Sequence, residues 1–147
     1  KYGADVIKFC ATGGVLSLGD AVGVQQYTQE EMNVLVETAN MAERTVAAHA
    51  HGKEGMQRAI RAGVRTIEHG TLMDVETARL MVKYGTYYVP TISAGEFVYK
   101  KAQKPGYFPE IIRPKALAIG PAISILLDGR LSCLIRFLLS LLLKRKS

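Results

Sequence analysis

The three histidines of this chain are the first residues whose types and spacing suggest chemistry. His49 ends the run TVAAH, His51 follows two residues later, and His69 ends the run TIEH, 20 residues after His49. In parallel α/β folds, ligands and metals bind at the carboxyl ends of the strands. Imidazole nitrogen is a common Zn²⁺ ligand. The spacing therefore predicts a shared crevice and a metal site, with ordinary hydrogen-bonded histidines as the alternative.

Lys8 adds a second chemistry to this crevice. It stands inside the apolar run VIKFC, where an unpaired ammonium is costly to bury. A desolvated lysine can lose its proton and become nucleophilic. It could then form a Schiff base, or take up carbon dioxide and become an anionic carbamate that bridges two metals. The alternative is that the Lys8 ammonium extends to water from the end of its strand.

The elements that must position these side chains alternate regularly. Apolar runs predict strands at 4–10, Thr45–Ala50, 64–68 and 86–92, the last one weakened by its proline. Helical periodicity and capping signals predict helices over 28–44, Lys53–Ala62 and 74–85. A loop or lid with a short helical piece over 96–109 and a helix over 110–119 should follow.

This alternation predicts an α/β protein with a parallel sheet. An open doubly wound sheet or part of a (β/α)8 barrel would fit. A complete barrel takes about 250 residues, whereas this chain has 147. We therefore expect the chain to hold about half of such a barrel.

The net charge of +6 would suit a protein that binds nucleic acid, but its distribution argues against that class. Residues 122–147 hold five basic residues and one acid, a charge of +4, so 1–121 carries only +2. A DNA-binding domain should have its charge on a folded face. The amino-terminal residues do not resemble a signal peptide, and we expect a cytoplasmic location.

Three sequence strings resemble the amidohydrolase superfamily. They are GADVIKFCATGG, ERTVAAHAHG and GVRTIEHGTLMD, in that order, and the likeness extends over about 1–121. They are most similar to the branch that includes imidazolonepropionase-like enzymes, Xaa-Pro dipeptidases (prolidases) and arginine carboxypeptidases. The resemblance implies strands four to seven of a distorted (β/α)8 barrel with one or two zinc ions.

The resemblance also implies roles for individual residues. Lys8 would be the strand-four lysine, carboxylated and bridging the metals, and His49 and His69 would be the ligands of strands five and six. His51 and Thr12 would meet the substrate, a small peptide or another amide. In the family, metal-activated water attacks the carbonyl of a C–N bond. Hydrolysis of a dipeptide or of a cyclic amide is therefore implied.

Two family motifs are missing from the sequence. There is no H-x-H pair before Lys8, and the only aspartate after Asp74 is Asp128, in a context unlike the strand-eight motif. We therefore expect a central fragment of the enzyme, inactive alone. The likeness ends where the composition changes, so we divide the chain into a partial barrel, 1–121, and a Leu-rich basic tail, 122–147, that a frameshift could have produced.

Two non-catalytic alternatives remain at this point. The tail could attach the chain to anionic lipid or to a partner, although its apolar run, 131–143, is shorter than the roughly 20 residues that span a bilayer. Alternatively, the chain is a structural βα fragment whose exposed sheet edges drive self-association into an oligomer.

Overall fold

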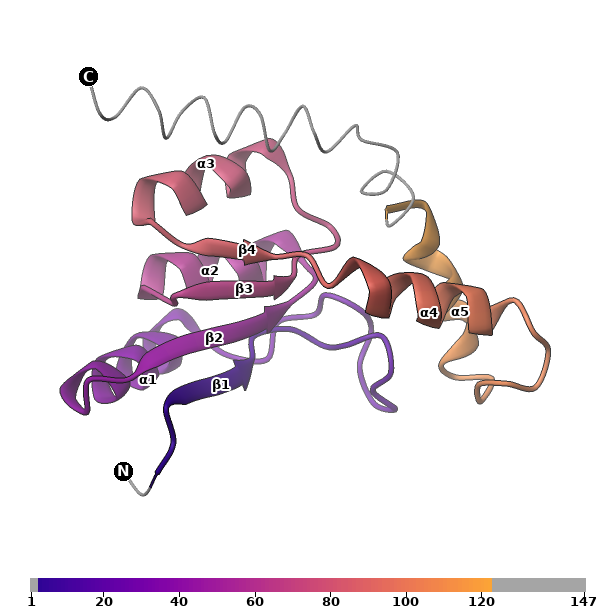
Figure 1. Ribbon diagram of the computed structural model, residues 1–147, viewed down its shortest axis with the longest axis horizontal. Coiled ribbons are helices and arrows are strands. Elements are labelled where there is room, and N and C mark those ends of the chain that lie inside the picture. The colour runs from indigo at the N-terminus through magenta and orange to yellow at the C-terminus, as the bar shows by residue number, and fades with distance from the viewer. Residues whose placement is uncertain (1–2, 123–147) are drawn as a thin grey trace.

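A four-stranded parallel sheet organises the protein. The structure, a computed structural model, describes residues 3–122 (Figure 1). The strands are β1 (Val6–Cys10), β2 (Thr45–Ala50), β3 (Thr66–His69) and β4 (Tyr87–Val89), and they pair in the order β1-β2-β3-β4. Each strand is parallel to the next, with Lys8 opposite Ala47 and Ala48 opposite Ile67. The predicted α/β class and parallel sheet are confirmed.

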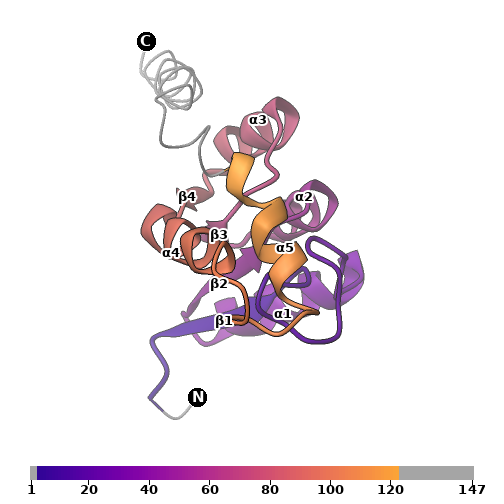
Figure 2. The same ribbon diagram turned by 90° about the vertical axis from the view of Figure 1, so that its right-hand side faces the viewer.

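Five helices pack around one face and the carboxyl end of this sheet within the described residues. Helices α1 (Gln29–Met41), α2 (Lys53–Ala62) and α3 (Val75–Tyr84) lie along one side of it (Figure 2). Helices α4 (Ile92–Ala102) and α5 (Arg113–Ala118) lie instead at the carboxyl ends of the strands. The carboxyl ends of the strands therefore face α4 and α5, whereas α1, α2 and α3 cover one face of the sheet.

The two faces of the sheet differ in burial because successive strand residues point to opposite faces. Val46, Ala48, Ala50 and Ile67 are buried with Met32, Met56 and Ile60 in the main hydrophobic core. On the opposite face, Lys8 and Cys10 are exposed. In this structure the Lys8 side chain therefore extends to water, which is the alternative that the sequence left open. β1 is an edge strand, and nothing in residues 3–122 covers this part of its other face.

Local signals in the sequence account for most helix ends. The Thr28 side chain accepts a hydrogen bond from the Glu31 N–H, and the Glu31 carboxylate accepts one from the Thr28 N–H, as the T-x-x-E motif predicts. Gly63 and Gly85 end α2 and α3 in the left-handed conformation that glycine adopts without strain. Helix α1 ends at Met41, earlier than predicted, because Glu43 has a φ of 55° and turns the chain into β2.

Asp74 begins α3, and its cap should make the stability of the protein depend on pH. Its carboxylate Oδ1 accepts hydrogen bonds from the Thr77 N–H and hydroxyl, which lower the pKa of Asp74. A carboxylate whose pKa is lower in the folded state stabilises the protein fully above its unfolded-state pKa. This stabilisation is lost as the pH falls through the folded-state pKa. We expect Asp74→Ala to cost about 1 kcal/mol at pH 7 and progressively less in acid. Urea unfolding across this pH range measures the effect.

Asp74→Asn is the matched control for this prediction, because asparagine keeps the capping oxygen without the titrating charge. It should retain most of the stability at pH 7. If Asp74→Ala unfolds at the same urea concentration as the wild type at pH 7, the cap contributes nothing measurable.

The region after β3 departs most from the prediction. β4 has only three residues, and the predicted strand residue Ile92 instead begins α4. The short helical piece expected within 96–109 is the second part of α4, where Glu96 and Lys100 pair across one turn of the helix. α5 is shorter than expected and carries Pro114 in its first turn, where the missing N–H costs little.

No helix in residues 3–122 is long and apolar enough to cross a membrane. The Leu-rich run 131–143 and the predicted boundary after 121 concern the tail, which lies outside the described residues apart from residue 122. The proposals for lipid attachment and for a frameshift-like origin of the tail therefore stay predictions.

Candidate functional site

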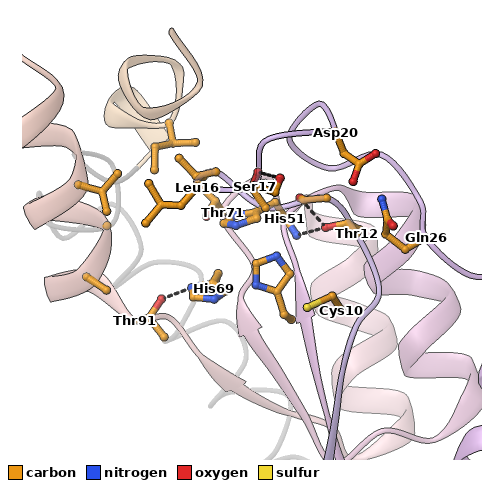
Figure 3. Close-up of a pocket in the computed structure, with 18 of the residues that line it drawn as sticks. Cys10, Thr12, Leu16, Ser17, Asp20, Gln26, His51, His69, Thr71 and Thr91 are labelled. Atoms are coloured by element: carbon orange, nitrogen blue, oxygen red, sulfur yellow. Dashed lines mark hydrogen bonds between the residues drawn. The ribbon is translucent and has the colours of Figure 1, made fainter. Parts of the chain in front are cut away.

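A cavity of about 390 Å³ lies at the carboxyl ends of β1, β2 and β3, between the strand ends and α4 (Figure 3). Its polar lining includes the three histidines and Thr12, Thr71 and Thr91. The apolar side comes from Val15, Leu16, Val98 and Ile119, and Pro90 lines it as well. The cavity thus joins hydrogen-bonding groups to an apolar wall, which is typical of a small-molecule site.

His49 presents an unpaired nitrogen in this cavity. Its Nε2 is buried and has no hydrogen-bond partner in the structure. Gly14 lies against the same ring, and a Cβ added to Gly14 would come within 3.3 Å of Nε2. Buried polar atoms are rarely left unpaired, and each one calls for an explanation such as an ion or a catalytic role. A metal ligand is one such explanation.

His51 is held more rigidly than the sequence suggests. Its side chain is buried, its backbone N–H donates to the Thr12 hydroxyl at 2.9 Å, and its Nδ1 lies 2.9 Å from the Thr71 hydroxyl (Figure 3). These contacts join the ends of β1 and β2 to the segment that follows β3. They fix the orientation of the ring and do not involve its second nitrogen, Nε2.

His69 reaches the cavity by an unexpected route. His49 lies opposite Glu68, and His69 lies opposite Ala50, so the two histidines are one residue out of register. Strand alternation alone would send their side chains to opposite faces. His69, however, has a φ of 72°, outside the strand region, and its Nδ1 lies 2.6 Å from the Thr91 hydroxyl. The Tyr88 hydroxyl also donates to the His69 carbonyl at 3.0 Å.

As a result, the imidazoles of His49 and His69 meet as the sequence predicts, and that of His51 lies beside them. The ring centroid of His49 lies 4.8 Å from that of His51 and 4.7 Å from that of His69. The rings of His51 and His69 are stacked with centroids 5.0 Å apart. Non-glycine residues with positive φ persist where the surrounding structure holds them, and they cluster at functional sites. His69 and its partner Thr91 both have positive φ.

The electrostatics keep these imidazoles neutral. Burial, assisted by the charges of His69 and Lys8, lowers the pKa of His49 to about 4, while a Gly13 backbone hydrogen bond opposes this shift. Burial also lowers the pKa of His51 to about 3. The pKa of His69 is lowered mainly by burial and by Lys8. Neutral imidazole is the form that binds metals.

Lys8 and Thr12 are placed differently relative to the cavity. Thr12 is 1% exposed, lines the cavity and holds His51 through its hydroxyl. Lys8 is close enough to His49 and His69 to influence their pKa values, but it does not line the cavity. The structure thus assembles the three histidines and Thr12 and leaves Lys8 at the margin.

The donor set fits a metal in part. Neutral imidazoles and the unpaired His49 Nε2 are suited to zinc. Hydrogen bonds from the second ring nitrogens of His51 and His69 to threonine hydroxyls resemble the outer-shell contacts that orient metal ligands. However, within residues 3–122 no group of three or more His, Cys, Asp or Glu side chains is arranged to hold an ion. These residues therefore fit a partial metal centre.

Sequence reasoning missed the two threonines that orient the histidines. Thr71 follows the His69–Gly70 turn, and Thr91 follows Pro90. Thr91 has a φ of 47° where a strand end was expected. The only sequence signal for either residue is its position just after a strand in an adjacent βα unit.

A parallel βα sheet with a histidine-lined cavity at its strand ends defines an α/β protein with a small-molecule site. More particularly, the chain belongs to the amidohydrolase family, whose model matches residues 1–120. Members of this family are hydrolases and are generally metal-dependent. The predicted family and the predicted part of a (β/α)8 barrel are both confirmed.

Several relatives support this assignment. The chain is 45% identical to ochratoxinase of Aspergillus niger over 96 residues, which are 65% of this chain and 20% of that protein. A crystal structure of a Xaa-Pro dipeptidase with methionine bound in the active site matches with 57% identity and a TM-score of 0.80, covering 83% of this chain and 30% of that one. A prolidase complexed with N-methylphosphonate-L-proline matches at 37% identity and a TM-score of 0.75, covering 82% and 29%. This chain thus spans between a fifth and a third of these relatives.

Proposed function

We propose that this chain supplies the central part of a metal-dependent amidohydrolase that cleaves a peptide-like or cyclic amide C–N bond. The convergence of His49, His51 and His69 on one cavity, with His49 Nε2 unpaired, carries this proposal. The prolidase and ochratoxinase relatives support an amide substrate. The apolar wall beside the histidines is compatible with a small dipeptide.

In this mechanism, His49 and His69 would hold zinc, and His51 and Thr12 would meet the substrate. When bound, zinc supplies a Lewis acid that activates water and polarises the carbonyl. The chain's own residues prepare the site for it. Thr91 orients the His69 ring, burial keeps both imidazoles neutral, and the apolar wall excludes water from one side of the substrate.

We further propose that Lys8 is carboxylated in the complete enzyme. Its amine would form an N–C bond with carbon dioxide and release one proton, which gives a carbamate with two oxygen donors. Lys8 is paired with Ala47, two residues before His49 on the neighbouring strand, and its charge lowers the pKa of both His49 and His69, which supports a group on this side chain near the same centre. Crystallographic density beyond the Lys8 nitrogen would support the carbamate, and a bare amine beside a bound metal would contradict it.

The chain of 147 residues should hydrolyse dipeptides little or not at all by itself. It spans about 30% of the Xaa-Pro dipeptidase that it matches, and residues 3–122 offer only a partial metal centre. The measurement is the release of amino acid from Met-Pro and similar dipeptides by purified protein with added zinc. Turnover that a chelator abolishes would show that the remaining ligands are not needed.

A further inference from the structure

Lys115 connects α5 to the loop that follows β1. Its Nζ donates to the backbone carbonyls of Ser17 at 2.5 Å and Asp20 at 2.8 Å, with that of Gly14 at 3.5 Å. The Ser17 hydroxyl lies 3.5 Å from the same nitrogen. These partners are about 100 residues away in sequence, so the contact fixes the relative position of two distant segments.

The loop that Lys115 binds also covers the ring of His49. Gly14 lies so close to this ring that an added Cβ would stand 3.3 Å from both Cε1 and Nε2. Gly13, beside it, has a backbone hydrogen bond that raises the pKa of His49. The position of residues 13–14 therefore determines which atoms contact the His49 imidazole from the loop.

Further contacts hold Lys115 and the loop in this arrangement. Val15 of the loop packs with Ala102, Ala116 and Ile119 in a second apolar cluster. The Arg113 side chain donates to the Ala102 carbonyl at 3.1 Å and holds α5 on α4. The Lys115 ammonium also has no ion pair among residues 3–122, and its hydrogen bonds run to the loop. Hydrogen bonds from an ionised donor are stronger than neutral ones.

We propose that Lys115 is a positioning residue, which holds the 14–20 loop against His49 and thereby fixes the orientation of that imidazole. Its importance for hydrolysis rests on the proposed function, whereas the contact itself does not. The test therefore measures the loop and the ring directly, so that the positioning role can fail without the amidohydrolase proposal failing with it.

The experiment compares the full chain with Lys115→Met, which keeps most of the side-chain length and removes the charge. Hydrogen exchange reports on the backbone amides of the loop, and NMR of the imidazole Cε1–H groups reports on the rings. Loss of a charge-assisted contact should speed amide exchange over 14–24 by about 10-fold or more. The His49 signal should shift or broaden, while His51, which Thr12 and Thr71 hold, keeps its signal.

Lys115→Arg should restore part of the protection, because it retains the charge and the donors. Lys104→Met is the matched control, since Lys104 is an exposed lysine on the segment between α4 and α5, and it should leave all signals unchanged. Wild-type exchange and an unmoved His49 signal in Lys115→Met would overturn the proposal. Equal changes at all three histidines would also overturn it, since they would show a general loss of structure.

Discussion

Replacing both His49 and His69 with alanine is expected to abolish zinc binding by the chain. The two rings lie 4.7 Å apart between centroids, burial lowers the pKa of each, and the His49 Nε2 has no other partner. Loss of an outer-shell contact alone typically weakens metal binding by 10–100-fold, so loss of two ligands should weaken it by more than about 100-fold. Elemental analysis of purified protein and titration with zinc provide the measurement.

His51→Ala is the matched control for the double variant, because it removes a neighbouring imidazole that the family resemblance does not make a ligand. It should keep most of the zinc. The opposite pattern, with zinc kept in His49→Ala and lost in His51→Ala, would reverse the assignment within the HAH sequence. A wild-type chain that binds no zinc would remove the metal proposal for these residues.

The approach of His49 to His69 could be predicted from sequence because it depends on the regular succession of neighbouring βα units. Strands that recur about every 20 residues and pair in parallel bring their carboxyl ends to one edge, where His49 is the second-last residue of β2 and His69 is the last residue of β3. The offset between them could not be predicted. It is compensated by the φ of His69 and by Thr91, which approaches from the start of the next helix.

The structure differs from the prediction where distant segments decide the outcome. Whether Lys8 is buried depends on what covers the far face of β1, which no pattern within VIKFC contains. Only the second part of α4 could be predicted, where the Glu96–Lys100 pair supports a helix, because Pro90 and Gly95 weaken the helical pattern at its start. The Lys115 contact joins residues about 100 positions apart, so no local signal marks it.

Gly55 is the residue whose substitution should most directly connect stability to the site. It lies within α2, where glycine is ordinarily about 1 kcal/mol less favourable than alanine. Here, however, an added Cβ would stand 2.3 Å from the Thr12 Cγ2 and 3.3 Å from the Ala11 carbonyl oxygen. Thr12 is 1% exposed, and its hydroxyl accepts the buried His51 N–H, so it has little freedom to move.

Gly55→Ala is therefore expected to destabilise the protein, although the same change on an open helix stabilises it. Overpacking costs about 1–3 kcal/mol, and displacement of the Thr12 hydroxyl adds the penalty of an unpaired buried N–H, about 1–3 kcal/mol. After the gain in helix propensity, the free energy of unfolding should fall by about 2 kcal/mol. Urea unfolding followed by circular dichroism measures it. Gly19→Ala, where an added Cβ meets nothing within 4 Å, is the control.

Thr12→Ser in the Gly55→Ala background separates the clash from any other effect of the new methyl group. Serine lacks the Cγ2 atom that the alanine would meet but keeps the hydroxyl that accepts from His51. If the clash causes the loss, the double variant should be more stable than the sum of the two single effects predicts, which is a favourable coupling between neighbours. Purely additive effects, or a Gly55→Ala protein as stable as the wild type, would show that α2 and the loop that follows β1 adjust without strain. Favourable coupling would show instead that close packing of α2 holds Thr12, and through it His51, in place.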